Sequence, residues 1–212
     1  MRKILTLSTL FATAIITGTL SMGYHSQTNP QAQSGAASAI FAGGCFWCVE
    51  SDFDKLPGVV ATTSGYAGGH LDNPTYKSVT RGNTGHYEVV KVDYDPSKVS
   101  YEKLLEVFWH SVDPTDDGGQ FCDRGQSYAT AIIALDANQQ NAALTSKQQL
   151  VNAGYDIATP VLPAATFFPA EGYHQDYYLK NPVRYKYYRY SCGRDAQVNR
   201  VWGDMAYKGL PK

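Results

Sequence analysis

The sequence has no excess of charge of either sign, because 18 Lys and Arg residues stand against 19 Asp and Glu residues among 212 positions. The formal net charge is -1, so the chain lacks the excess of basic residues that is typical of nucleic-acid binding proteins. There is also no internal repeat and no second linker beyond the N-terminal region. With 43% hydrophobic residues, the chain has enough apolar side chains for one buried core, and we expect a single globular domain.

Metal-binding patterns are scarce as well. The five histidines are scattered without a short-range pair, and only two of the four cysteines, Cys45 and Cys48, lie close together. A structural zinc site usually needs a second such pair, whereas Cys122 and Cys192 are isolated. We therefore expect no metal, and a structural role for His174.

The N-terminus differs in composition from the rest of the chain. A basic start precedes an uncharged, largely apolar run over residues 4–20, which is typical of a secretory signal. Residues 1–23 are thus predicted to be a signal peptide or an N-terminal anchor, and residues 24–38 a flexible tether. The domain is expected over residues 39–212, exported to the periplasm or another extracytoplasmic compartment, with the N-terminal segment either cleaved or retained in the membrane.

Short-range patterns predict alternating strands and helices, which indicates an α+β domain with helices packed on a sheet. Residues 70–86 and 113–127 are expected to be mostly loop, and the tyrosine-rich C-terminal segment has no clear period. The predicted strands cover residues 39–44, 58–67, 86–96 and 128–135, with another near Val161; the predicted helices cover residues 45–56, 100–112, 136–154 and 171–180.

Cys45 is the first candidate for chemistry. It follows two glycines at the predicted start of a helix, where unpaired N–H groups and the helix dipole stabilise a thiolate. Its neighbour Cys48 leaves other interpretations open. The pair could exchange disulfides as in thioredoxin-like proteins, or all four cysteines could form structural bridges in an oxidising compartment.

Glu88 is the most informative carboxylate. A period of two over residues 86–94 places it on one face with Val90 and Val92, in apolar surroundings. Desolvation would raise its pKa and keep it protonated, as a general acid requires, unless the strand is a solvated edge. Glu50 lies in the first turns of the helix after Cys45 and is expected to be a surface residue.

Six motifs occur together and in order: "GGCFWCVE", "GYAGG", "NPTYKSV", "GHYEVV", "DRGQSY" and "EGYHQDYYL". From about Ala39 to Cys192 the chain resembles the A class of peptide methionine sulfoxide reductases. The resemblance implies a two-layer ferredoxin-like plait, with a mixed sheet, helices packed on it and a long irregular C-terminal segment. It also implies reduction of the S epimer of methionine sulfoxide, free or in proteins, without metal or organic cofactor, as a repair of oxidative damage.

By the same resemblance, Cys45 is the nucleophile and Glu88 the proton donor. Both assignments agree with the properties argued from the residues themselves. Tyr76 and Tyr128 match tyrosines that hydrogen-bond the sulfoxide oxygen. These four residues would carry the first chemical step.

Three further residues match the family's site. Phe46 and Trp47 correspond to the pocket that receives the methyl group on sulfur, a task suited to apolar aromatic walls. Asp123 corresponds to an aspartate that orders the site and its water. Taken without the resemblance, the two aromatic residues would be assigned to the core.

The resemblance also implies a disulfide cycle. Cys45 would become a sulfenic acid, which condenses with a second thiol. Cys192 in the C-terminal tail is the favoured resolving thiol, with Cys48 as the alternative, while Cys122 is expected to be a spectator. Many members have a second tail cysteine, which this sequence lacks. The expected partners are a thioredoxin or thioredoxin-like reductant and oxidised proteins or peptides, acting on a monomer. A general thiol–disulfide oxidoreductase and a secreted module with four structural cysteines are the alternative functions.

Overall fold

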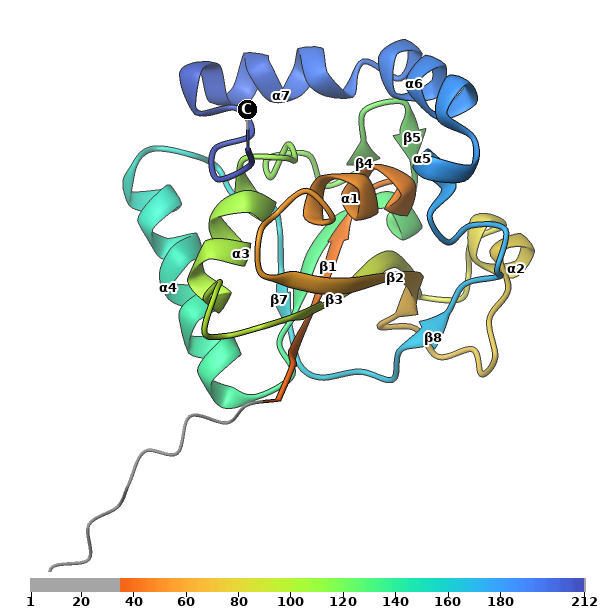
Figure 1. The fold of residues 1–212 in the computed structure, drawn as a ribbon, viewed down its shortest axis with the longest axis horizontal. Coiled ribbons are helices and arrows are strands. Elements are labelled where there is room, and N and C mark those ends of the chain that lie inside the picture. Colours follow the sequence, from red (N-terminus) through yellow and green to blue (C-terminus); the bar gives the residue numbers. More distant parts are fainter. Residues whose placement is uncertain (1–34, 212) are drawn as a thin grey trace, which may run out of the picture. The chain divides into compact units, whose positions relative to one another are not determined.

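The computed structural model describes residues 35–211 and contains a six-stranded mixed sheet (Figure 1). Neighbouring strands are antiparallel except for the parallel pair at one edge, β6 and β7. The mixed sheet and the α+β class are as predicted. In spatial order the strands are β7 (Val161–Leu162), β6 (Thr130–Ile133), β1 (Ala37–Gly43), β3 (Tyr87–Tyr94), β2 (Val59–Ala67) and β8 (Phe168–Pro169).

The predicted signal or anchor over residues 1–23, and the tether up to residue 34, lie outside the described residues. Strand β1 begins at Ala37, two residues before the expected start of the domain at Ala39. No helix within residues 35–211 is both long enough and apolar enough to span a membrane.

The three longest predicted helices form at their predicted places, with N-terminal caps that explain where two of them begin. Ser100 and Asp136 each accept a backbone N–H from the third residue of the helix that follows. These helices are α1 (Phe46–Phe53), α3 (Tyr101–Trp109) and α4 (Ala137–Asn152).

Both segments expected to be loops contain regular structure. Helix α2 (Tyr76–Thr80) begins at a capping box between Thr75 and Ser78, a short local signal that the loop prediction overlooked. The other segment contains a small hairpin of β4 (Gly119–Gln120) and β5 (Asp123–Arg124), followed by a 3-10 turn, η1 (Gln126–Tyr128).

The prediction of a long irregular C-terminal segment is wrong, because this segment is mostly helical. It forms α5 (Tyr177–Lys180), α6 (Pro182–Ser191), α7 (Arg194–Trp202) and a 3-10 turn, η2 (Gly203–Met205). Polar and aromatic residues occur on every face of α6, so its sequence shows no apolar stripe. A contact far along the chain supports it: Arg189 pairs with the buried Asp52 of α1 at 2.9 Å.

The main core lies between the sheet and helices α1 and α3, which Figure 1 shows on one face of the sheet. Val90 and Val92 of β3 point into this core and are fully buried, while Val89 faces a smaller cluster on the opposite side. Glu88 lies two residues before Val90 and so projects from the helix-covered face. The strand alternation therefore places a carboxyl group beneath the start of α1.

Candidate active site at the start of helix α1

Cys45 is the N-cap residue of α1, at the point where β1 turns into the helix. Gly44 makes this turn with a φ of +80°, and a Cβ at that position would lie 2.6 Å from the Cβ of Gln120. Glycine is therefore required there by both conformation and space. The side chain of Cys45 is held at a helix start, as predicted, but it is 93% buried rather than open.

Glu88 meets the helix from the adjacent strand. The backbone N–H of Phe46 donates to Glu88 Oε2 at 3.1 Å, and Glu88 Oε1 has no hydrogen-bond partner within residues 35–211. Burial raises the pKa of Glu88 to about 8, with the Phe46 N–H opposing the rise. Because β3 lies between β1 and β2, the alternative of a solvated edge strand is wrong. Glu88 is thus protonated at neutral pH, as predicted.

Burial also determines the protonation of the Cys45 thiol. It raises the pKa of Cys45 well above its usual value, and the neighbouring Cys48 and Glu88 add to the rise. The Tyr188 hydroxyl acts in the opposite direction but does not reverse it. The expected stabilisation of a thiolate by the helix N-terminus is therefore outweighed in this state, in which the thiol is buried and interacts with Cys48, Glu88 and Tyr188.

Aromatic rings form a wall beside Cys45. The Phe46 ring lies 4.9 Å from the His174 ring and 6.4 Å from the Tyr76 ring, measured between centroids. Trp47 stacks on Tyr177 at 3.7 Å, and its Nε1–H donates to His174 Nδ1 at 3.0 Å. That bond leaves the proton of a neutral imidazole on Nε2, and burial lowers the pKa of His174, which agrees with a structural histidine.

The two predicted tyrosines lie on the Glu88 side of the site. Burial raises the pKa of Tyr76 to about 12, and burial followed by the Glu88 charge raises the pKa of Tyr128 above its usual range. Both phenols therefore remain neutral and able to donate. Glu171, which the sequence argument missed, positions this wall by accepting the Tyr76 backbone N–H at 2.9 Å and the Tyr66 hydroxyl at 2.8 Å. It belongs to the quoted "EGYHQDYYL" motif, which was the available signal.

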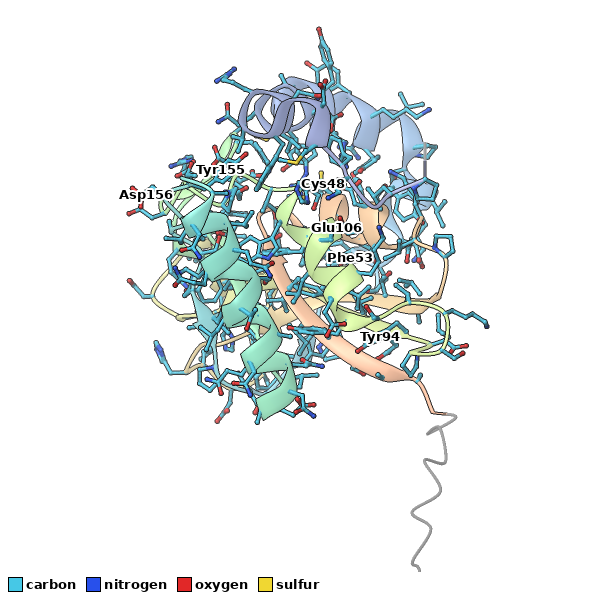
Figure 2. All side chains as sticks on the ribbon, turned by 90° about the vertical axis from the view of Figure 1, so that its left-hand side faces the viewer. Cys48, Phe53, Tyr94, Glu106, Tyr155 and Asp156 are labelled. Atoms are coloured by element: carbon cyan, nitrogen blue, oxygen red, sulfur yellow. A yellow bond between two sulfur atoms is a disulfide. The ribbon has the colours of Figure 1, made fainter. Side chains whose placement is uncertain are left out.

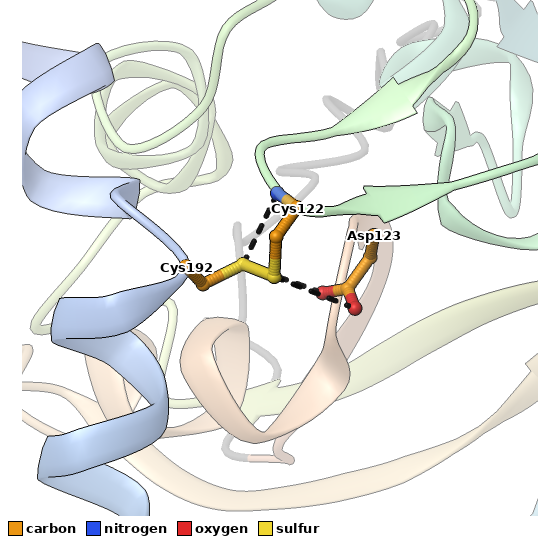
Figure 3. Close-up of side chains that lie close together, drawn as sticks. All are labelled: Cys122, Asp123 and Cys192. Atoms are coloured by element: carbon orange, nitrogen blue, oxygen red, sulfur yellow. Dashed lines mark hydrogen bonds between the residues drawn. A yellow bond between two sulfur atoms is a disulfide. The ribbon is translucent and has the colours of Figure 1, made fainter.

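The tail brings the remaining predicted residues to the site. Cys192 forms a disulfide with Cys122, so the expectation that Cys122 is a spectator is wrong (Figure 3). Asp123 lies beside this disulfide and accepts a hydrogen bond from the Tyr188 hydroxyl. Tyr188, another residue that the sequence argument missed, also packs edge-to-face with the Trp47 ring, with the ring centroids 5.6 Å apart. The tail helix α6 thus closes over the aromatic wall.

Residues 37–206 match the family model described as "Peptide methionine sulfoxide reductase". The chain belongs to this family. The peptide methionine sulfoxide reductase MsrA 2 of Rhizobium meliloti (strain 1021) is 55% identical over 176 residues, which cover 81% of this chain and 86% of that protein. The protein is therefore an oxidoreductase that reduces methionine sulfoxide.

Two solved structures agree with this assignment. The methionine sulfoxide reductase A of Corynebacterium diphtheriae has a TM-score of 0.64 and 35% identity, and covers 71% of this chain and 77% of its own. The reduced form of Mxr1 from Saccharomyces cerevisiae has a TM-score of 0.65 and 31% identity, over 71% of this chain and 88% of its own.

Cys48 lies one helical turn beyond Cys45 in this reductase, and Figure 2 shows it on the side facing the C-terminal helices. Interaction with the Cys45 thiol lowers the pKa of Cys48; burial opposes this, and the Arg194 and Arg189 guanidinium groups add to it. Cys45 and Cys48 both remain unbonded among the described residues. The alternative with four cysteines in structural bridges is therefore wrong for this structure.

Glu50 corrects another expectation about the reductase. It is fully buried rather than a surface residue, and its Oε2 accepts the Asp176 backbone N–H at 3.1 Å. Burial raises the pKa of Glu50 to about 7. Its surroundings come from the C-terminal half of the chain, so the helix pattern around Glu50 gave no sign of them.

Proposed function

We propose that the reductase acts on the S epimer of methionine sulfoxide, free or in oxidised proteins and peptides, with Cys45 as nucleophile and Glu88 as proton donor. The observation that carries this proposal is the buried carboxyl group of Glu88, held by the Phe46 N–H beneath the start of α1, where burial raises its pKa to about 8. A buried acid at this place can protonate an oxygen that leaves the sulfur under attack by the neighbouring Cys45. No metal or organic cofactor is required for this step.

The first half-reaction transfers one oxygen atom. The Cys45 sulfur attacks the sulfoxide sulfur, Glu88 protonates the sulfoxide oxygen, and that oxygen ends on Cys45 as a sulfenic acid while methionine leaves. Glu88 then recovers the proton that the Cys45 thiol gives up. Tyr76 and Tyr128 donate hydrogen bonds to the oxygen as its negative charge develops, which favours the transition state over the bound substrate.

The arrangement of these groups explains selection between epimers. A sulfoxide sulfur carries an oxygen, a methyl group and the rest of the methionine side chain, and Cys45 must attack it from a fixed direction. The oxygen faces Glu88 and the two tyrosines, and the methyl group lies against Phe46 and Trp47. With these two groups placed, only one epimer directs the rest of the methionine side chain toward solvent.

Further features of the family are proposed for the whole chain. The antiparallel order β6-β1-β3-β2, with α1 and α3 as crossovers, supports a two-layer ferredoxin-like plait. We propose that residues 1–23 export the enzyme to the periplasm or another extracytoplasmic space, as a cleaved signal or an anchor, and that residues 24–38 form a tether. The enzyme would act as a monomer in protein repair, with Asp123 ordering the site, Cys192 resolving the sulfenic acid, and a thioredoxin-like protein supplying electrons.

The test compares the S and R sulfoxides of acetyl-methionine amide, each incubated with dithiothreitol and the mature domain and analysed by chromatography. Consumption of the S epimer alone, and its loss in Cys45→Ser, is the expected result. If neither epimer is consumed while a model disulfide is reduced, the protein is a general thiol–disulfide exchanger and the proposal is wrong.

A further inference from the structure

The disulfide between Cys122 and Cys192 joins two parts of the molecule that are 70 residues apart in sequence. Cys122 lies in the turn between β4 and β5 and is exposed to solvent. Cys192 ends helix α6 and is half-buried. The bond therefore ties the tail to a hairpin of the domain, at the molecular surface.

The Cys122–Cys192 disulfide and the nucleophile share a neighbour, the hydroxyl group of Tyr188. The Tyr188 hydroxyl lies 3.9 Å from Cys192 Sγ, and the same hydroxyl interacts with the Cys45 thiol. Asp123 accepts a hydrogen bond from Tyr188 and has Oδ2 3.9 Å from Cys192 Sγ. Cys45 and Cys192 thus have one phenol as a common neighbour, and Tyr188 must shift before their sulfur atoms can meet.

The chain next to Cys192 has room for such a shift. Gly193 separates α6 from α7 with a φ of +73°, and a Cβ there would meet no atom of the described residues within 4 Å. Beyond Cys192 the sequence contains no further cysteine. Among the four cysteines, Cys122 is the one bonded to Cys192, so it is the thiol placed to attack a disulfide at that sulfur.

We propose that Cys122 is the thiol that regenerates Cys45, and that the Cys122–Cys192 disulfide is the form of the enzyme that an external dithiol protein reduces. This inference rests on the proposed function. The Cys192 thiol attacks the Cys45 sulfenic acid, giving a Cys45–Cys192 disulfide and water. The Cys122 thiolate then attacks Cys192 Sγ, breaks its bond to Cys45 and leaves Cys45 to take up a proton. The external dithiol finally gives two electrons to the Cys122–Cys192 bond and becomes a disulfide itself.

Accessibility explains the need for this relay. Cys45 is 7% exposed and Cys48 is 1% exposed, so a folded protein cannot bring its own thiol to either sulfur in this conformation. Cys122 is exposed, and a surface depression lined by Phe121, Cys192 and Gly193 lies beside the disulfide. The relay moves the disulfide from the buried Cys45 to the surface and restores the Cys45 thiol. The structure has the state that results, with Cys45 reduced and Cys122 bonded to Cys192.

The test counts methionine released by fully reduced enzyme from excess S sulfoxide without added reductant. Wild type should release about two equivalents, because the first turnover leaves Cys45 free for a second oxidation, whereas Cys122→Ser should release about one and retain a Cys45–Cys192 disulfide. Peptide mapping identifies the bonds. With thioredoxin present, the steady-state rate of Cys122→Ser should fall roughly tenfold or more, while its first turnover stays within about twofold of wild type.

Cys48→Ser is the matched control, because Cys48 is the one cysteine that has no step in the relay. This variant should still release about two equivalents of methionine and form the Cys122–Cys192 disulfide. Unchanged methionine yield and unchanged thioredoxin-dependent turnover in Cys122→Ser would overturn the relay. A wild-type map dominated by Cys45–Cys48 would do the same. Absence of any methionine from the first turnover of wild type would instead contradict the proposed function, so the two failures are distinguishable.

Discussion

Replacement of Glu88 by Gln tests the proton donor directly. Glutamine keeps the size of the side chain and an oxygen that can accept the Phe46 N–H, which now donates at 3.1 Å, but it has no acidic proton. With a pKa of about 8, roughly nine-tenths of Glu88 is protonated at pH 7. An unperturbed carboxyl group would be protonated to only about 0.3%, so burial enriches the active acid roughly 300-fold.

We expect Glu88→Gln to slow the first turnover by about 10² to 10³-fold at pH 7, the usual contribution of a general acid. The assay is rapid quenching of the reduced enzyme with saturating S sulfoxide between pH 6 and 10. Because Glu88 contributes to the raised pKa of Cys45, the Cys45 titration is measured in each enzyme from the pH dependence of alkylation, and the ratio of wild-type to variant rates is corrected for it. That ratio should be constant below about pH 8 and fall roughly tenfold per pH unit above it.

Glu50→Gln is the matched control, since Glu50 is another buried carboxyl group but accepts the Asp176 N–H instead of facing the thiol. Its first turnover should stay close to that of wild type, and both variants should retain a Cys45 thiol that iodoacetamide can alkylate. A first turnover of Glu88→Gln near that of wild type, or a rate ratio that stays constant up to pH 10, would refute the assignment of Glu88 as the acid.

Three further predictions concern binding and stability. Trp47→Leu removes the ring that stacks on Tyr177 at 3.7 Å and should raise KM roughly tenfold in steady-state assays, with a smaller effect on kcat. Arg189→Met removes the partner of the buried Asp52 at 2.9 Å and leaves the longer contacts with Lys55 and Arg194, at 3.4 and 3.9 Å. It should cost about 3 kcal/mol in urea unfolding, a loss that adding Asp52→Asn should partly reverse. Because the folded pKa of Glu50 is raised to about 7, its contribution to stability is full below its usual pKa and is lost as the pH rises through 7. The unfolding free energy of wild type should therefore fall between pH 4 and 8 by up to about 3 kcal/mol more than that of Glu50→Gln.

Each of these predictions can fail clearly. An unchanged KM in the Trp47 variant would remove that ring from the substrate pocket. A double variant at Arg189 and Asp52 no more stable than the single one would show that loss of charge pairing is not the cause. Parallel pH dependences of unfolding for wild type and Glu50→Gln would mean that Glu50 titrates normally in the folded protein.

Local patterns were sufficient for the parts of the fold that short segments determine. The period of two around Glu88 predicted which face of β3 is buried, and the helix patterns over residues 100–112 and 136–154 predicted where two helices begin. The same glycine and helix signals placed Cys45 at the start of α1.

Contacts between distant segments could not be predicted in this way. Helix α6 lacks an apolar stripe, and its ion pair from Arg189 to Asp52 spans 137 residues. Glu50 is buried because the Asp176 segment covers it, 126 residues away. Pairing between Cys122 and Cys192 also depends on tertiary structure, because four cysteines allow several pairings that sequence alone cannot separate.

The measurement that tests the central claim most directly is the fate of the sulfoxide oxygen on Cys45. The reduced Cys192→Ser variant is exposed, in separate samples, to one equivalent of the S or the R epimer. Any sulfenic acid that forms is trapped with dimedone. Mass spectrometry should locate the adduct on Cys45, in proportion to the methionine released, with the S epimer alone. Methionine released without an adduct or disulfide at Cys45, or an adduct on another cysteine, would contradict the account.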